Sequence, residues 1–247
     1  MTIRILKKLA LISIITFPLF SLGDLAKDLL LASDRRRGGM AEGIQWETQV
    51  DTIEEGETTT RSFKVRAQDN DAVVDALTPA RNKGEIYLFN DRNMWFFKPT
   101  LKKPVVISPR QKLTGQAANG DIASTRYARD YNPTLEKTDT VNGEKVHVLL
   151  LKAKTNNLTY DQIRYYVQDK TKLAIKAEFL TLQGKPFKIG ELKYDNSITI
   201  KGEKIPFVSE LKITDAKFAQ NQSVIRYKDP KIASFPKSIF SVNNLSR

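Results

Sequence analysis

The sequence contains no cysteine, and this absence removes several kinds of chemistry at once. Disulfides, thiolate catalysis, zinc–cysteine sites and a lipid anchor attached through cysteine are all excluded. Histidine is nearly absent too. Because His147 is the only one in 247 residues, no histidine-based triad or multi-histidine metal site can form. The sequence therefore predicts no catalytic residue, no metal and no cofactor.

Long apolar runs are scarce as well, since only residues 9–20 form one. This run follows a basic start and precedes the small residues Ser21 and Gly23, so residues 1–23 read as a signal peptide cleaved after Gly23. The alternative is an uncleaved membrane anchor, but the run is shorter than the ~20 residues that a bilayer requires, and it contains Pro18. We expect export to the periplasm.

Acidic residues are fewer than basic ones, 28 against 40, which gives a net charge of +12. The predicted signal peptide holds three basic residues and no acid, so its removal leaves +9. This charge favours anionic surfaces such as lipid head groups. Nucleic acid is the rival polyanion, but export argues against it, and the basic residues are dispersed rather than clustered with aromatics. We predict no nucleic-acid partner and transient contact with membrane surfaces.

Beyond the signal, alternation of apolar and polar residues dominates the sequence. It predicts a short helix near residues 25–33 and then about 10–11 strands joined by tight turns, of which Glu55-Gly56 and Asn142-Gly143 give the clearest hairpin signals. Residues 24–247 are expected to form a single domain, although their length would also allow two. The predicted class is mainly β (α+β).

So many strands must curve, and the expected architecture is a curved antiparallel sheet that forms an incomplete barrel. Several strands are apolar on both faces, as where Met94 and Phe96 alternate with Trp95 and Phe97. Helices are therefore expected to plug the concave face. The candidate segments are residues 25–33, residues 110–130 and the tail near Ile239 and Phe240.

Residues 84–215 carry motifs that resemble the outer-membrane lipoprotein-sorting protein family. A strand with the family's "W-x-Y-x-P-x-L-K-K" pattern runs through residues 93–103, and a glycine-containing loop follows it at residues 110–115. After this loop the chain departs from the family, because residues 116–130 are rich in Ala, Asn and Arg instead of acidic and aromatic residues. The other matching steps are Lys83-Gly84, Asp169-Lys170-Thr171, Lys176-Ala177-Glu178-Phe179 and Gly184-Lys185.

This resemblance implies a periplasmic lipoprotein-carrier-like fold with an apolar cavity for the acyl chains of a lipid or lipoprotein. It further implies transport in outer-membrane biogenesis, with an inner-membrane exporter of the resistance-nodulation-division type as a partner. Two rivals remain open. One is an envelope signalling or accessory module that senses lipid or docks on an envelope protein. The other is an envelope hydrolase, which would need a nucleophile beside a base.

Large aromatic side chains on the strands are the candidate lipid-binding residues, although ordinary core packing explains them equally well. They are Trp46, Phe63, Trp95, Phe97, Tyr166 and Phe179.

The basic run Arg35, Arg36 and Arg37 is the candidate contact for a lipid head group or an acidic partner. A solvated helix end is the alternative, because cations are favourable near a helix C-terminus.

Overall fold

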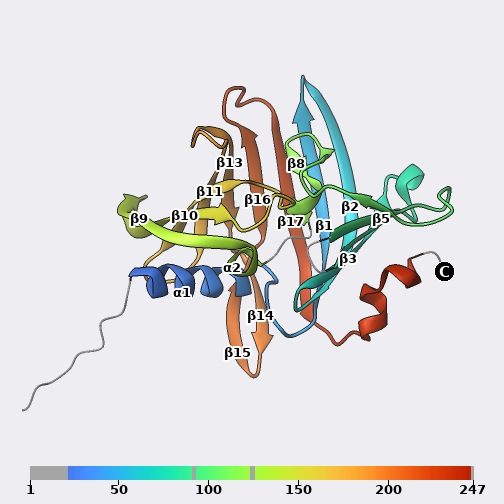
Figure 1. Cartoon of the computed structure of the whole chain (residues 1–247), viewed down its shortest axis with the longest axis horizontal. Helices are drawn as coiled ribbons and strands as arrows, with labels where there is room; N and C mark the ends of the chain where they lie inside the picture. Colours follow the sequence, from blue (N-terminus) through green and yellow to red (C-terminus); the bar gives the residue numbers. More distant parts are fainter. Residues whose placement is uncertain (1–21, 91–92, 123–125, 246–247) are drawn as a thin grey trace, which may run out of the picture.

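The computed structural model describes residues 22–90, 93–122 and 126–245. Its centre is a 13-stranded antiparallel sheet, which curves without closing into a barrel (Figure 1). In spatial order, the strands are β6 (Val105–Ile107), β5 (Asn93–Phe97), β4 (Ile86–Asn90), β3 (Asp71–Thr78), β2 (Glu57–Gln68), β1 (Ile44–Glu54), β17 (Gln222–Ile232), β16 (Glu210–Asp215), β13 (Pro186–Lys193), β12 (Ala174–Leu180), β11 (Gln162–Gln168), β10 (Glu144–Ala153) and β9 (Tyr131–Val141).

Two meanders make up this sheet and meet where β1 pairs with β17. Tight turns join many neighbouring strands. At Glu55-Gly56 and Asn142-Gly143, both turn residues have positive φ, the conformation whose twist matches that of the flanking strands. Both predicted hairpins are confirmed.

The predicted N-terminal helix is also confirmed as α1 (Leu22–Arg35). It buries Ala26, Leu29 and Leu30 in the main core, and it packs against β9, β11 and the short helix α2 (Tyr127–Asp130). We call the sheet face that carries the main core the inner face, and the opposite face the outer face. Helix α1 thus covers part of the inner face.

Two small hairpins stand outside the main sheet. One joins β7 (Lys112–Thr114) to β8 (Ala117–Ala118), and the 3₁₀ turn η2 (Asn119–Ile122) follows it. The other joins β14 (Asn196–Ile200) to β15 (Glu203–Phe207); it packs against β17 and projects beyond the body of the sheet in Figure 1. Residues 110–130, expected to contribute to a helical plug, therefore hold the β7–β8 hairpin as well as η2 and the short helix α2.

The tail takes a different place from the one expected. Its 3₁₀ turns η3 (Lys237–Phe240) and η4 (Val242–Asn244) pack on a second apolar cluster that includes Val73 and Leu88. Because Val74 and Phe89 belong to the main core, alternation puts Val73 and Leu88 on the outer face. The tail therefore covers the outer face, which corrects its candidacy as a plug of the concave face.

The sheet has thirteen strands, more than the ten or eleven expected. One reason is that β6 has only three residues, too few to show alternation. The expected strand at residues 204–214 is divided between β15 and β16, which lie in different sheets. A fourth 3₁₀ turn, η1 (Ala80–Asn82), precedes β4.

The predicted signal peptide lies outside the described residues apart from its last two positions, which begin α1. In the described part of the chain, no helix is both long and apolar enough to cross a membrane.

Candidate functional site

The β7–β8 hairpin and η2 form a loop, residues 111–122, that we call the lid. Two glycines let it sit close to its neighbours. A Cβ on Gly115 would lie 2.1 Å from Thr52 Cγ2 and 2.7 Å from Ser223 Oγ, and a Cβ on Gly120 would lie 1.9 Å from Thr159 Oγ1. Gly115 also has a φ of +50°, which disfavours other residues. The family-like glycine loop is therefore held tightly against the paired strands β1 and β17 and against Thr159.

Polar contacts anchor the lid to both halves of the sheet. The backbone N–H of Gln116 donates to Ser223 Oγ at 2.9 Å, and Ser223 Oγ lies 2.9 Å from Thr52 Oγ1. From β13, Lys188 Nζ donates to the Gln116 carbonyl at 2.6 Å. The lid also buries Leu113, Ala117 and Ile122 in the main core, so hydrogen bonds and apolar packing share the anchoring.

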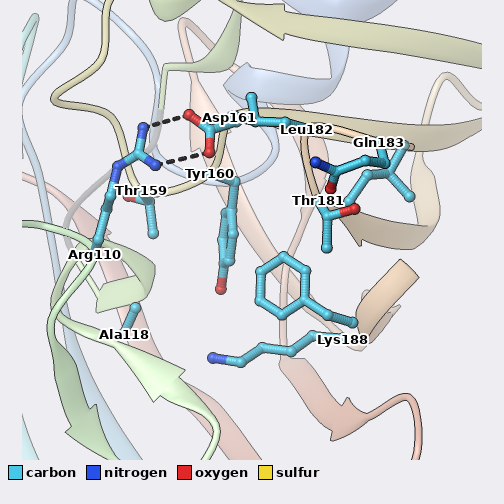
Figure 2. A pocket seen from close by; sticks show the side chains of 11 residues that line it. Arg110, Ala118, Thr159, Tyr160, Asp161, Thr181, Leu182, Gln183 and Lys188 are labelled. Atoms are coloured by element: carbon cyan, nitrogen blue, oxygen red, sulfur yellow. Dashed lines mark hydrogen bonds and ion pairs between the residues drawn. The ribbon is translucent and has the colours of Figure 1, made fainter. Parts of the chain in front are cut away.

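A pocket of about 410 Å³ opens beside the lid, between the lid and the turn that joins β12 to β13 (Figure 2). This volume lies within the usual range for small-molecule sites. The lining residues come from three separate parts of the chain: Arg110, Ala118, Thr159, Tyr160, Asp161, Leu180, Thr181, Leu182, Gln183, Phe187 and Lys188.

Aromatic rings form one side of this pocket. Tyr160 stacks on Phe179, with 3.9 Å between the ring centres, and Phe187 lies 6.2 Å from Tyr160. At the rim, Leu182 is 70% exposed and Phe187 is 39% exposed. The pocket thus links exposed apolar side chains to Phe179 in the main core.

Lys188 and the Tyr160 hydroxyl give the pocket its polar side, and the buried Asp121 lies behind them. The Tyr160 hydroxyl donates to Asp121 Oδ2 at 2.9 Å, and the Ala118 N–H donates to the same carboxylate at 2.8 Å. Burial raises the pKa of Asp121 and lowers the pKa of Lys188, although the two charges attract each other. A polar or anionic group entering the pocket would therefore meet an ammonium and a hydroxyl beside apolar surface.

On the opposite wall, Arg110 and Asp161 form a two-bond ion pair, which Figure 2 shows as dashed lines. The distances are 2.8 and 2.6 Å, and the hydrogen bonds from Arg110 hold the pKa of Asp161 below its usual value. This bidentate pair fixes the start of the lid to the segment before β11.

Three of the predicted aromatic residues lie in the main core. Trp46 packs against Phe207 with ring centres 5.9 Å apart, and its indole N–H donates to Thr48. Phe63 and Phe179 are likewise almost fully buried. Of the three, Phe179 lies behind the pocket wall, because its ring stacks on Tyr160, which lines the pocket.

The other three lie on the outer face. Trp95 and Phe97 pack beneath the C-terminal tail, whereas Met94 and Phe96 from the same strand face the main core. Tyr166 belongs to a third cluster on the outer face, and its hydroxyl donates to Glu178 at 3.0 Å. The six residues therefore do not line one common cavity.

The three arginines at the end of α1 lie in different surroundings. Arg35 is exposed, and Arg36 Nη1 donates to the Ala32 carbonyl at 2.6 Å, as the alternative of a helix end predicts. Arg37 is only 5% exposed. Its guanidinium lies 4.5 Å from the ring centre of Tyr127, and Nη1 donates to the Tyr165 hydroxyl. The run therefore does not form one surface patch.

Sequence reasoning missed the pocket because its walls are far apart in the chain. Arg110 was noted only as part of a motif, and Asp161 lies 51 residues later. The sequence did contain one signal, since Leu182 and Phe187 flank a glycine turn where polar residues are usual.

The acidic residues and the single histidine of the described chain do not gather into a metal-binding group. No group of three or more metal-ligating side chains occurs there. His147 contacts Asp169, and its β10 neighbours Val146 and Val148 belong to the outer-face cluster of Tyr166, away from the lid pocket.

Comparisons with known proteins support one family. A family model described as an uncharacterized protein matches residues 68–247. No curated protein sequence matches the chain. Among solved structures, a LolA superfamily protein from Nitrosomonas europaea is similar at 29% identity with a TM-score of 0.78, over 87% of this chain and 97% of that one.

Two more distant structures share the fold. A DUF1329 family protein from Desulfovibrio piger has 18% identity and a TM-score of 0.75, over 92% of this chain and 100% of that one. An outer membrane lipoprotein-sorting protein domain from Vibrio parahaemolyticus has 17% identity and a TM-score of 0.75, over 91% and 100%. The matched family model places the chain in the family that it describes, and the curved sheet, the glycine loop and these similarities support the resemblance to outer-membrane lipoprotein-sorting proteins, whose carrier-like fold the chain shares.

Proposed function

We propose that the protein binds an acyl chain of a lipid or lipoprotein in the periplasm and carries it between membranes. The observation that carries this proposal is the pocket beside the lid, where exposed Leu182 and Phe187 lead to the Tyr160–Phe179 stack of the main core. Each CH₂ group moved from water into such a site contributes ~0.8 kcal/mol. Binding, and not catalysis, is the proposed activity.

The acyl chain enters past the lid. The lid rests in part on hydrogen bonds at the Gln116 backbone, which donates to Ser223 and accepts from Lys188, and on the Arg110–Asp161 pair. Water can replace these polar contacts when the lid moves. Lys188 and the Tyr160 hydroxyl line the same opening, so they meet the polar end of the ligand while the chain contacts the aromatic rings. Moving the lid exposes apolar core to the incoming chain.

Transfer to and from membranes is the second part of the proposal. The similarity to a LolA superfamily protein and to a lipoprotein-sorting domain supports it, and the resemblance of the sequence motifs points to an inner-membrane exporter of the resistance-nodulation-division type as a partner. The predicted signal peptide supports a periplasmic location.

Native mass spectrometry with lipid extraction tests the binding step. Protein purified from the periplasm is expected to carry a stoichiometric lipid or acylated peptide. Phe187→Glu puts a charge at the pocket rim and is expected to lower occupancy at least tenfold, because an ionised carboxylate is costly beside apolar surface. Phe187 is partly exposed, so the variant should remain folded.

Leu31→Glu is the matched control. Leu31 is 47% exposed on α1 and does not line the pocket, so this variant should keep its cargo. Lipid-free wild-type protein that also takes up no lipid from vesicles would rule out the carrier proposal and favour a docking module.

A further inference from the structure

Two loops at one corner of the sheet bring five basic residues together, and the pocket uses none of them. The first loop leads from β3 to β4, and the second leads from β5 to β6. They touch, because a Cβ on Gly84 would lie 2.9 Å from Pro99 Cγ. We call this group the basic corner; its cations are Arg81, Lys83, Lys98, Lys102 and Lys103.

The cations of the basic corner are all exposed. Among the described residues, none of their side chains forms an ion pair or a hydrogen bond. The nearest acid in sequence, Glu85, is already engaged: Arg61 donates to one of its oxygens at 2.9 Å and Asn82 to the other at 2.8 Å. Five neighbouring positive charges without a described acidic partner repel one another and attract an anionic surface.

Apolar side chains lie beside these charges. Val105 and Val106 begin β6 directly after the second loop and are 39% and 62% exposed, and Leu77 at the end of β3 is 38% exposed. Strand β6 is an edge strand of the described sheet, so it pairs with β5 along one edge and its other edge is open. Exposed cations next to aliphatic side chains suit the interface of an anionic bilayer, where head groups meet the charges and the acyl boundary meets the apolar groups.

We propose that the basic corner docks the protein on the anionic phospholipid surface of a membrane. This inference goes beyond acyl-chain binding, because it concerns a separate surface and does not require a cargo. The Leu-Lys-Lys motif at residues 101–103 thereby gains a role of its own: two of its three residues are cations that face the membrane. Nucleic acid fits less well, because the exposed apolar side chains here are aliphatic and offer bases no ring to stack on.

Co-sedimentation with vesicles tests the proposal. The wild-type protein should bind phosphatidylglycerol-containing vesicles at about 0.1 M salt, bind phosphatidylcholine vesicles much less, and dissociate at high salt because charges are then screened. The triple variant Lys98→Gln/Lys102→Gln/Lys103→Gln should bind roughly 100-fold more weakly, since each lysine near an anionic surface contributes about fivefold.

The control triple variant is Lys152→Gln/Lys170→Gln/Lys204→Gln, which removes the same charge from exposed and scattered sites. It should lose less than about threefold. Val106→Ser should weaken binding severalfold without a change in charge. An equal loss in both triple variants, or a preference for an acidic protein over phosphatidylglycerol vesicles, would overturn the proposal.

Cargo occupancy separates this inference from the carrier proposal. The Lys98/Lys102/Lys103 variant should keep its cargo in native mass spectrometry while losing vesicle binding. Phe187→Glu should show the reverse. Retained vesicle binding by the triple variant overturns the basic corner whatever the state of the pocket.

Discussion

The inner and outer faces of the sheet are both apolar, but they are covered in different ways. On the inner face, the lid combines hydrogen bonds at Ser223 and Lys188 with buried apolar residues of the main core such as Ile122, and two glycines permit its close approach. On the outer face, the tail is held mainly by apolar contacts such as those of Phe240, with one hydrogen bond from Asn90 Nδ2 to the Phe240 carbonyl at 2.9 Å. The polar contacts of the lid can be exchanged with water when it moves, whereas apolar packing, which holds most of the tail, leaves core exposed when a cover moves away.

Gly115→Ala should disrupt the seating of the lid on the inner face and have the largest effect on stability. The new Cβ would collide with Thr52 and would keep a positive φ, so we expect a loss of about 3–5 kcal/mol in unfolding free energy or a displaced lid. Thermal unfolding measures the first result, and limited proteolysis within residues 111–122 measures the second.

Gly143→Ala is the matched control for that substitution. Gly143 also has positive φ, but no atom lies within 4 Å of its Cβ position, so the cost should be about 1 kcal/mol. Equal losses in the two variants would show that the lid is not tightly seated.

Phe240→Ala should loosen the packing of the C-terminal tail on the outer face. The side chain is 4% exposed in the outer cluster, so its removal should cost about 3 kcal/mol in unfolding free energy. Cargo occupancy should stay unchanged, because the tail and the pocket lie on separate surfaces. A variant that loses cargo while staying folded would argue against two independent covers.

Asp34→Asn should have a smaller effect, at the contact between α1 and α2 on the inner face. Burial raises the pKa of Asp34 to about 7 in the folded protein, so the folded state holds a proton that the unfolded state releases near pH 4. Stability from this group is present below about pH 4 and is lost as the pH rises toward 7. The variant should therefore be more stable than wild type at pH 8 and differ little from it at pH 4, as measured by thermal unfolding.

The hydrogen bond from the Ala128 N–H to Asp34 Oδ2, at 2.8 Å, can be retained by asparagine. A stability difference that does not vary with pH would mean that Asp34 is already ionised or solvated in the folded protein.

The sequence predicted the hairpins well because their signals are local. Asn142-Gly143 fixes a turn through two adjacent residues, and the amphipathic pattern of α1 spans a few turns of helix. The faces of β5 were harder to assign. Met94 and Phe96 alternate with Trp95 and Phe97, so both sets are apolar and the pattern does not say which set faces inward.

The burial of charged side chains was also not predicted from the sequence. Arg37 sits in a run that is typical of a solvated helix end, yet it enters a cluster of tyrosines supplied by distant segments. The pocket is a similar case, because the lid, the start of β11 and the β12–β13 turn come together only in the folded sheet. Such groupings depend on tertiary pairing, which short-range patterns do not encode.

The pairing of β1 with β17 sets the order in which this protein can be assembled. Thr52 and Ser223 face each other across the middle of the sheet, yet they are 171 residues apart in the chain. A ribosome makes β1 early and its partner near the end, so the two meanders stay unjoined until synthesis is almost complete. Long-range pairing of this kind is slow. A chain that stops before β17 would leave β1 and β16 as unpaired edges, exposed to aggregation.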